Sequence, residues 1–298
     1  MAQQTGNGAK PIIGFIGTGV MGRPMAGRLI DAGYDLNVYN RTPGKCAPLV
    51  SKGAKLMDGP GEVASASDVV FSIIGFPEDV EDVYLAPGGV VERARPGALL
   101  IDMTTSSPSL ARRIYDAAKA RGAGACDAPV TGGDKGAREA KLAILVGGDE
   151  GDFNRALPLF RVLGKNIVHF GPAGSGQYAK LANQVIIAGT MLGLCEGLAY
   201  AERAGIDPKK LVECIENGAA GSWSLSNYGP RILDGDFSPG FFVKHFIKDM
   251  NLAKESSLAF GLDLSGLATA LASYRKLAEQ GGGENGTQGL YRLYEEKK

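Results

Sequence analysis

A lysine and two amide side chains stand at helical spacing in the middle of the chain. Lys180 is followed by Asn183 and Gln184, and side chains three and four positions apart share one face of an α-helix. The flanking residues are mostly apolar, so these polar groups must either reach water or line a polar cavity. In a cavity, the lysine can give or take a proton during a reaction. For this segment taken alone, a lysine that extends to solvent near the helix start is the alternative.

Three glycines near the start of the chain form a G-x-G-x-x-G pattern. Gly17, Gly19 and Gly22 follow an apolar run and precede a helix-like stretch. This arrangement provides a tight turn, close approach to a pyrophosphate and close packing of helix on strand. A glycine-rich turn that binds nothing is the alternative, but the strand, turn and helix context favours a dinucleotide. The predicted contacts come from Gly17, Thr18, Gly19, Val20 and Met21.

The end of the second apolar run indicates which dinucleotide binds. Enzymes that use NAD commonly place an Asp or Glu there to bond the ribose hydroxyls. This chain has Asn40, Arg41 and Thr42 instead. The guanidinium of Arg41 suits a 2′-phosphate, so we expect NADP(H), with NAD(H) as the weaker alternative. A solvated surface arginine is the other interpretation of Arg41.

A further polar segment follows the apolar run at 98–101. Ligands of open parallel sheets bind beyond the carboxyl ends of the strands, so Thr105 could face the nicotinamide. Capping of the next helix by Ser106 or Ser107, ahead of Pro108, is the alternative explanation, and the two are compatible.

Thr131, Gly132 and Gly133 form a second polar segment. Adjacent glycines can expose backbone N–H groups as an anion nest, where a substrate carboxylate would fit beside the Thr131 hydroxyl. A plain turn requires no ligand, and the pattern alone does not decide between the two.

The elements that must position these residues alternate in the first half of the chain. Strands are expected at 11–16, 36–39, 69–74, 98–101, 124–128 and 142–146, and helices at 21–32, 43–52, 78–85 and 108–121. This order predicts βαβ units and a parallel sheet. Beyond residue 171 helical periodicity takes over, with one long helix at 178–204 and another that begins at Asp207 and Pro208.

The predicted fold is an α/β Rossmann dinucleotide-binding domain followed by an all-α domain, joined by a long inter-domain helix. We expect a disordered tail at 1–10, an NADP-binding domain at 11–173, and a helical domain for substrate binding and oligomerisation at 174–298.

Composition narrows the class of protein. The 298 residues are 44% hydrophobic and 21% charged, with 32 basic and 32 acidic side chains, so nucleic acid and anionic membranes are not expected partners. The most apolar run, 185–195, is interrupted by glycines, is too short to span a bilayer and is typical of a buried helix. The scattered cysteines have no metal-ligand spacing and predict buried thiols in a reducing, cytoplasmic compartment: Cys46, Cys126, Cys195 and Cys214.

Taken together and in this order, the segments resemble the β-hydroxyacid dehydrogenase family, which includes 3-hydroxyisobutyrate dehydrogenase, tartronate semialdehyde reductase and the glyoxylate/succinic semialdehyde reductases. The resemblance covers about 11–295. It rests on these segments: GFIGTGVMGRPMAGRL, VYNRT, IDMTTSSP, DAPVTGGDKGAREAKLAILVGGD, GSGQYAKLANQ and HFIKDMNLA.

The resemblance implies a role for each matching residue. Lys180 corresponds to the catalytic lysine. Cofactor contacts are implied for Phe76, Pro77, Thr105 and Lys248, and Arg41 agrees with members that prefer NADPH. Substrate contacts are implied for Thr131, Gly132, Gly133, Asn183 and Asp249.

Two positions depart from the family pattern. Thr131 stands where serine is usual, which keeps the hydroxyl and narrows the pocket. An aspartate–serine pair that is common near the C-terminus is replaced around Thr287 and Gln288. Trp223 is either pocket wall or core, and core is the prediction.

The expected function is an NADP(H)-dependent oxidoreductase that interconverts a small β-hydroxy acid and its semialdehyde, as a homodimer or homotetramer. Alternatives are a non-catalytic NADP-binding module, a related imine reductase, and a decarboxylating dehydrogenase of a phosphorylated sugar acid. Lys180 disfavours the first two, and the chain length disfavours the third.

Overall fold

The computed structural model describes residues 10–295, which divide into two compact units at Lys180 and Leu181. The predicted tail at 1–10 lies outside the described residues except for Lys10, whose Nζ donates to the Ala32 carbonyl (2.8 Å).

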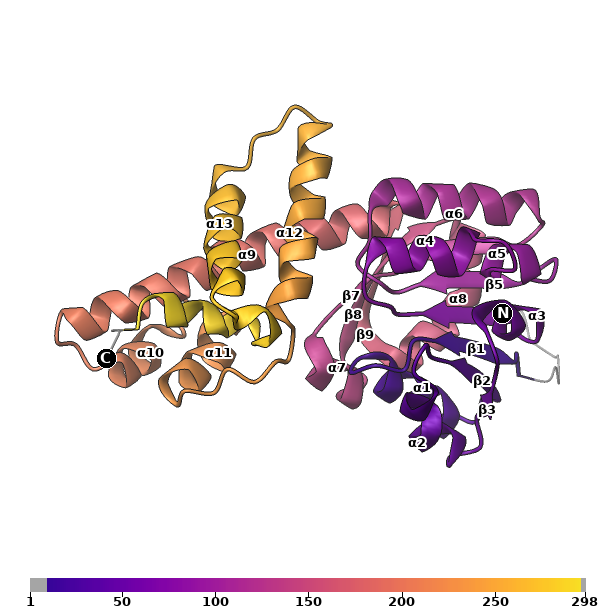
Figure 1. The fold of residues 1–298 in the computed structure, drawn as a ribbon, viewed down its shortest axis with the longest axis horizontal. Helices are drawn as coiled ribbons and strands as arrows, with labels where there is room; N and C mark the ends of the chain where they lie inside the picture. Colours follow the sequence, from indigo (N-terminus) through magenta and orange to yellow (C-terminus); the bar gives the residue numbers. More distant parts are fainter. Residues whose placement is uncertain (1–9, 296–298) are drawn as a thin grey trace, which may run out of the picture. The chain divides into compact units, whose positions relative to one another are not determined.

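The first unit is a sheet covered by helices on both faces (Figure 1). Its strands are β1 (Ile13–Ile16), β2 (Leu36–Tyr39), β3 (Lys55–Leu56), β4 (Val69–Ser72), β5 (Leu99–Asp102), β6 (Gly124–Asp127), β7 (Val130–Thr131), β8 (Leu142–Gly148) and β9 (Gly164–Gly171). Six of them form a parallel sheet in the order β3-β2-β1-β4-β5-β6, which is the order of a dinucleotide-binding Rossmann fold.

The other three strands extend this sheet. Strand β8 runs antiparallel to both β6 and β7, and β9 lies parallel to β8. The short β3 and β7 and the strand β9 were not predicted from the sequence. β3 and β7 have two residues each, and β9 mostly alternates exposed and half-buried side chains. None of the three strands therefore gives a continuous apolar run in the sequence.

Helices pack on the two faces of the sheet in separate groups. One face carries α1 (Gly22–Asp31), α2 (Ala47–Val50), α7 (Gly133–Glu139) and α8 (Glu150–Leu163). The other carries α3 (Pro60–Ser65), α4 (Pro77–Leu85), α5 (Val90–Arg93) and α6 (Pro108–Ala120). The expected helix at 43–52 is instead a 3-10 turn, η1 (Pro43–Cys46), followed by α2. The α/β prediction for this part is confirmed.

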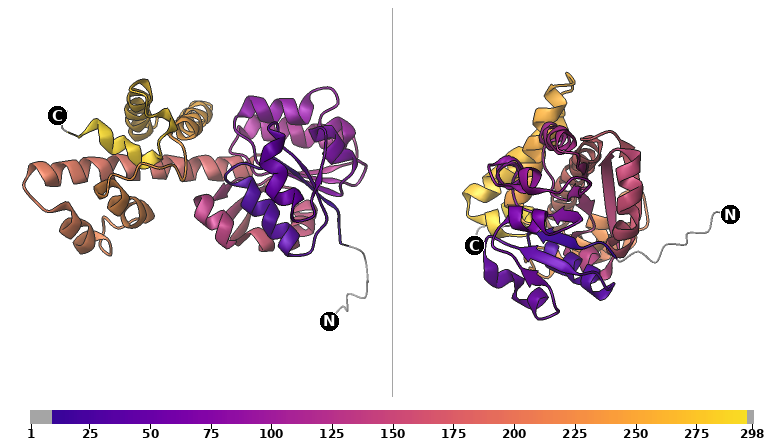
Figure 2. Two further views of the ribbon diagram at one scale, coloured as in Figure 1. Left: turned by 60° about the horizontal axis from the view of Figure 1, so that its bottom comes forward. Right: turned by 90° about the vertical axis from the view of Figure 1, so that its right-hand side faces the viewer.

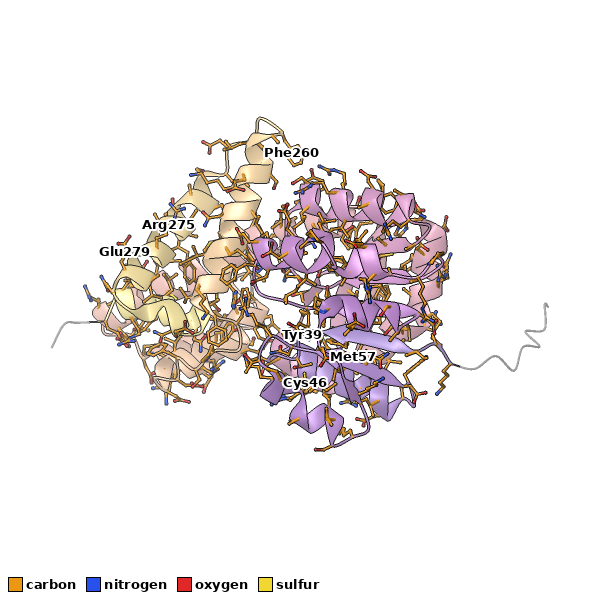
Figure 3. The ribbon with its side chains drawn as sticks, turned by 45° about the vertical axis from the view of Figure 1, so that its right-hand side comes forward. Tyr39, Cys46, Met57, Phe260, Arg275 and Glu279 are labelled. Carbon is orange, nitrogen blue, oxygen red and sulfur yellow. The ribbon has the colours of Figure 1, made fainter. Side chains whose placement is uncertain are left out.

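The second unit is built around the apolar helix α9 (Ser175–Arg203), whose first residues belong to the first unit (Figure 2). It contains α10 (Pro208–Ile215), α11 (Trp223–Leu233), α12 (Val243–Leu258), α13 (Ser265–Glu279), η2 (Gly282–Glu284) and η3 (Thr287–Leu293). Asp207 caps α10 as predicted, because its carboxylate accepts from the Lys209 N–H (2.9 Å). Arg275, labelled in Figure 3, ties α13 to α12 through Asn251 Oδ1 (2.7 Å).

Helix α9 is long and apolar enough to cross a membrane by length and composition alone. The core helix of a soluble protein meets the same criterion, and α9 contributes Ala188, Met191 and Cys195, each fully buried, to the core of the second unit. We therefore describe α9 as a core helix.

Candidate functional site

The residues predicted to bind the cofactor gather at one edge of the sheet, except Lys248, which lies on α12 in the second unit. Strands β1, β2, β4, β5 and β6 are parallel, so the loops after Ile16, Tyr39, Ser72, Asp102 and Asp127 share that edge. The chain order reverses between β1 and β4, and ligands of such sheets bind at this switch point.

The glycine-rich loop after β1 has the geometry of a pyrophosphate site. Gly17 has φ +93°, and its N–H donates to the Tyr39 carbonyl (2.9 Å). A side chain at Gly17 would overlap the Ile73 carbonyl, whereas a Cβ at Gly19 would meet nothing within 4 Å. Space at Gly19, in front of the start of α1, is what a pyrophosphate needs, so these residues fit a dinucleotide.

The loop after β2 is tied to this glycine loop. The Thr18 N–H donates to Asn40 Oδ1 (3.1 Å), and Asn40 Nδ2 donates to the Thr42 carbonyl (3.0 Å). Between them, Arg41 is 85% exposed in its side chain and pairs with Asp79 on α4 (3.0 Å). The predicted adenosine-end residues therefore stand together, and an acid that the sequence analysis did not select joins them.

The loops after β4 and β5 are joined through Thr104. The Ile74 N–H donates to Thr104 Oγ1 (2.9 Å), and Phe76 and Pro77 follow as the N-cap and first residue of α4. At the other end of the β5 loop, Ser107 Oγ accepts from the Leu110 N–H (3.1 Å), so capping of α6 by Ser107 is confirmed.

A buried carboxyl lies beneath these loops. Asp102 Oδ1 accepts from Ser72 Oγ (2.7 Å) and from the Thr104 N–H (3.1 Å), and Tyr84 Oη lies 2.8 Å from Ser72 Oγ. Burial raises the pKa of Asp102 to about 6, against the opposing effect of the hydrogen bonds from Thr104 and Ser72.

Thr105 is bracketed by a buried glutamine from α9. Gln177 Oε1 accepts from the Ser106 N–H (2.9 Å), and Gln177 Nε2 donates to the Thr104 carbonyl (2.8 Å). Gln177 is fully buried, so both bonds are shielded from water. These bonds fix the backbone on both sides of Thr105 to the first turn of α9.

Asp127, at the end of β6, holds the start of the same helix. Its two carboxylate oxygens accept from the N–H groups of Gly174 (2.7 Å) and Gln177 (2.8 Å). Burial raises the pKa of Asp127, and these backbone donors act in the opposite direction. Helix α9 begins at Ser175, three residues before the predicted start, because this carboxylate caps it.

Lys180 lies on α9 one turn after Gln177. It is 6% exposed, so the alternative of a lysine extended to solvent is contradicted. A buried lysine held by a capped helix is a candidate for proton transfer.

The segment at Thr131 combines a strand end with two glycines at positive φ. Thr131 ends β7, and Gly132 (φ +125°) and Gly133 (φ +63°) lead into α7. These conformations suit glycine and turn successive N–H groups in the manner of a nest.

Within the second unit, four polar side chains form a relay of polar contacts. Asn183 Nδ2 donates to Gln184 Oε1 (2.8 Å), Gln184 Nε2 donates to Asp249 Oδ2 (2.7 Å), and Lys248 Nζ lies 2.9 Å from Asp249 Oδ1. Gln184 and Asp249 are each 1% exposed. The relay therefore fixes the orientation of the Asn183 amide.

Two expectations about single residues are wrong, those for Trp223 and Cys214. Trp223 is 60% exposed and stacks edge-on against Tyr228, so its assignment to the core is wrong. Cys214 is exposed, whereas the other three thiols are buried as predicted. Thr287 and Gln288 are buried in the second unit, where Gln288 Nε2 donates to the carbonyls of Asp236 and Ser238 (3.0 Å each).

Asp79, Asp127 and Gln177 are among the residues of this arrangement that were not selected from the sequence. Their partners lie 38, 47 and 71 or more residues away, so no local pattern marks them. A cavity of about 540 Å³ opens at the opposite edge, beside the first residues of β4 and β5, and takes no part in the site.

Comparison with known proteins agrees with this geometry. A family model described as the NAD binding domain of 6-phosphogluconate dehydrogenase matches residues 12–171. A second, described as NAD-binding of NADP-dependent 3-hydroxyisobutyrate dehydrogenase, matches residues 174–294.

Similar sequences and structures cover almost the whole chain. A probable 3-hydroxyisobutyrate dehydrogenase-like protein of Arabidopsis thaliana is 52% identical over 93% of this chain and 83% of its own length. The oxidoreductase YkwC of Bacillus subtilis is 48% identical over 96% of this chain and 99% of its own. A 3-hydroxyisobutyrate dehydrogenase of Mycobacterium tuberculosis with L-serine has a TM-score of 0.88 at 29% identity, covering 97% of this chain and 100% of that one.

The fold and the site define an oxidoreductase that uses a nicotinamide dinucleotide and acts on CH–OH groups. The chain belongs to the β-hydroxyacid dehydrogenase family, as its motifs indicated.

Proposed function

We propose that this protein is an NADP(H)-dependent dehydrogenase that interconverts a small β-hydroxy acid and its semialdehyde, with Lys180 as general acid and base. The observation that carries the proposal is the buried Lys180, one helical turn from the Gln177 amide that brackets Thr105. Lys180 is thereby fixed relative to the edge of the sheet where the cofactor would bind.

The cofactor would be held along that edge. Gly17, Thr18, Gly19, Val20 and Met21 would surround the pyrophosphate, and Asn40, Arg41 and Thr42 the adenosine ribose with its 2′-phosphate. Phe76, Pro77, Thr105 and Lys248 would contact the nicotinamide half. Apart from Lys248, we assign the dinucleotide contacts to residues 11–173. Residues 174–298 would serve oligomerisation and, together with Thr131, Gly132 and Gly133, substrate binding.

The substrate would be a small carboxylate. N–H groups at Gly132 and Gly133, with the Thr131 hydroxyl, would bind the carboxylate group, as a nest does for an anion. Asn183, oriented by Gln184 and Asp249, would hydrogen-bond the reacting oxygen. L-serine, present with the M. tuberculosis relative, is itself a β-hydroxy acid.

Proton transfer is the task of the protein, since the bound cofactor supplies or accepts the hydride. In reduction, protonated Lys180 would donate to the carbonyl oxygen as negative charge develops there. In oxidation, neutral Lys180 would take the hydroxyl proton.

The cytoplasmic location stays a prediction.

A panel of substrates tests this function. Glyoxylate, succinic semialdehyde, tartronate semialdehyde and methylmalonate semialdehyde are offered with NADPH and with NADH, and L-serine and 3-hydroxyisobutyrate with the oxidised cofactors. We expect turnover of at least one compound, faster with NADPH than with NADH. Cofactor binding without turnover of any hydroxy acid or semialdehyde would favour a non-catalytic module, and turnover of cyclic imines alone would favour an imine reductase.

A further inference from the structure

An acidic residue stands at the place where the cofactor's 2′-phosphate is expected. Asp79 is the third residue of α4, and its Oδ1 lies 3.0 Å from Nη1 of Arg41. Arg41 follows β2 and Asp79 follows β4, the two strands that flank β1 in the sheet. The pair therefore spans the strand that ends in the glycine-rich loop.

This pair lies beside the predicted ribose site. Asn40, the neighbour of Arg41, accepts the Thr18 N–H of the glycine-rich loop (3.1 Å). The segment that carries Arg41 runs between Tyr39 and Cys46, both labelled in Figure 3, and Cys46 Sγ lies 3.4 Å from Thr18 Oγ1. Two contacts thus hold this segment against the loop.

The position of Asp79 bears on the choice between NAD(H) and NADP(H). NAD enzymes carry an acid at the end of the second strand to accept the ribose hydroxyls. Here the second strand ends without an acid, but α4 delivers a carboxylate to the same arginine. Within this one ion pair, Arg41 is a cation that could bind a 2′-phosphate and Asp79 is an acceptor that could bind a 2′-hydroxyl.

We propose that Asp79 is a specificity-determining residue that restrains the preference of the site for NADP(H). Its carboxylate competes with the 2′-phosphate for Arg41 and repels that phosphate, which carries about −1.5 to −2 charges at neutral pH. Toward NAD(H), the same carboxylate accepts hydrogen bonds from the ribose hydroxyls. The proposal rests on the proposed function, because it requires that a nicotinamide dinucleotide binds at the glycine-rich loop.

The exposure of the pair permits such an exchange of partners. The side chain of Arg41 is 85% exposed and that of Asp79 is 28% exposed. An ion pair this open to water contributes little to folding, so Arg41 can leave Asp79 for a phosphate at small cost. For the same reason, neutralising Asp79 should leave the fold intact.

Asp79→Asn tests the proposal, with Glu78→Gln as a matched control that removes one negative charge from the neighbouring exposed position of α4. Dissociation constants of the full-length variants for NADPH and for NADH are measured by calorimetry. Asp79→Asn should tighten NADPH binding about 3- to 10-fold, the scale of one unit charge removed near a phosphate in a partly hydrated site. NADH binding should weaken or stay level, and Glu78→Gln should change the NADPH/NADH ratio by less than about twofold.

Two results overturn the proposal. One is an NADPH/NADH ratio of dissociation constants in Asp79→Asn that equals the wild-type ratio. The other is a change of this ratio in Glu78→Gln as large as that in Asp79→Asn, which would show only a general effect of net charge. If the wild-type protein binds neither dinucleotide, the proposed function itself fails, and the proposal fails with it.

Discussion

At the residue scale, Asp102 shows what burial does to a single group. Its pKa rises from the ordinary 3.8 to about 6 because the carboxyl is shielded from water, although Thr104 and Ser72 donate to it. The folded protein thus binds this proton more tightly than the unfolded chain. The stability that results is fully present below pH ~4 and is lost as the pH rises through ~6.

Asp102→Asn should remove this pH dependence. The shift corresponds to roughly 3 kcal/mol, so the free energy of unfolding of the wild type, relative to the variant, should fall by up to that amount between about pH 4 and pH 7. Urea unfolding of both proteins across this range measures the difference. Asp116→Asn, at an exposed position of α6, is the surface control. A difference that stays constant or grows with pH would contradict this account of Asp102.

The residues of the site were predictable where a local pattern marks them and not otherwise. The glycine motif and Arg41 stand in segments whose local pattern indicates a dinucleotide, and Lys180 was selected through the order of the surrounding motifs and the family resemblance. Gln177 and Asp79 do not, because each acts through partners far along the chain. The expectation for Trp223 was wrong because residue type alone does not show burial. Trp223 lies at the exposed start of α11.

At the scale of elements, the turn from β1 into α1 contains glycines that the fold requires and one glycine that it does not require. Gly17 and Gly22 cannot take a side chain, because their Cβ atoms would overlap the backbone of Ile73 and of Gly17 respectively. Gly19 has open space and needs no unusual backbone conformation. Of the three glycines, Gly19 is the one that the fold does not require, so we expect a ligand to require it.

Gly19→Ala should fold normally and bind cofactor poorly. We expect a free energy of unfolding within about 0.5 kcal/mol of the wild type. The dissociation constant for NADPH should rise about tenfold or more, since the methyl group would occupy the place of the pyrophosphate. Gly151→Ala, at another open position in the first unit, should change neither quantity. Wild-type NADPH affinity in Gly19→Ala would show that the pyrophosphate does not bind at this loop.

The elements themselves were predicted where burial on both faces makes a strand apolar throughout. Strands β1, β4 and β5 are buried at every position and were recognised, whereas β9 alternates at the edge of the sheet and was not. The start of α9 was misplaced because the carboxylate that caps it comes from β6, 47 residues away.

At the scale of the whole molecule, α9 carries an exposed face that suggests self-association. Within the second unit, Ile186 is 70% exposed and Tyr200 is 75% exposed, with exposed Gly189, Gly193 and Gly197 between them on the helix. Small residues between two large apolar side chains allow close approach of another helix, and most oligomers are symmetric. We expect a homodimer or a homotetramer, with this face in the interface.

Ile186→Glu should weaken that association. A symmetric contact loses two buried isoleucines, each worth about 1.5–3 kcal/mol, so the dimer dissociation constant should rise at least about 100-fold. Light scattering across a dilution series measures the mass. Leu262→Glu, at an exposed apolar position after α12, should leave the mass unchanged. A monomeric wild type, or an Ile186→Glu protein of wild-type mass at every concentration, would exclude this face.

Proton transfer by Lys180 is tested by Lys180→Ala, with turnover and NADPH binding measured on the same preparation. We expect NADPH to bind with near wild-type affinity, because the proposed cofactor contacts are other residues, and kcat to fall about 10²- to 10⁴-fold. Near-normal kcat in a folded Lys180→Ala protein that binds NADPH would contradict this role of Lys180.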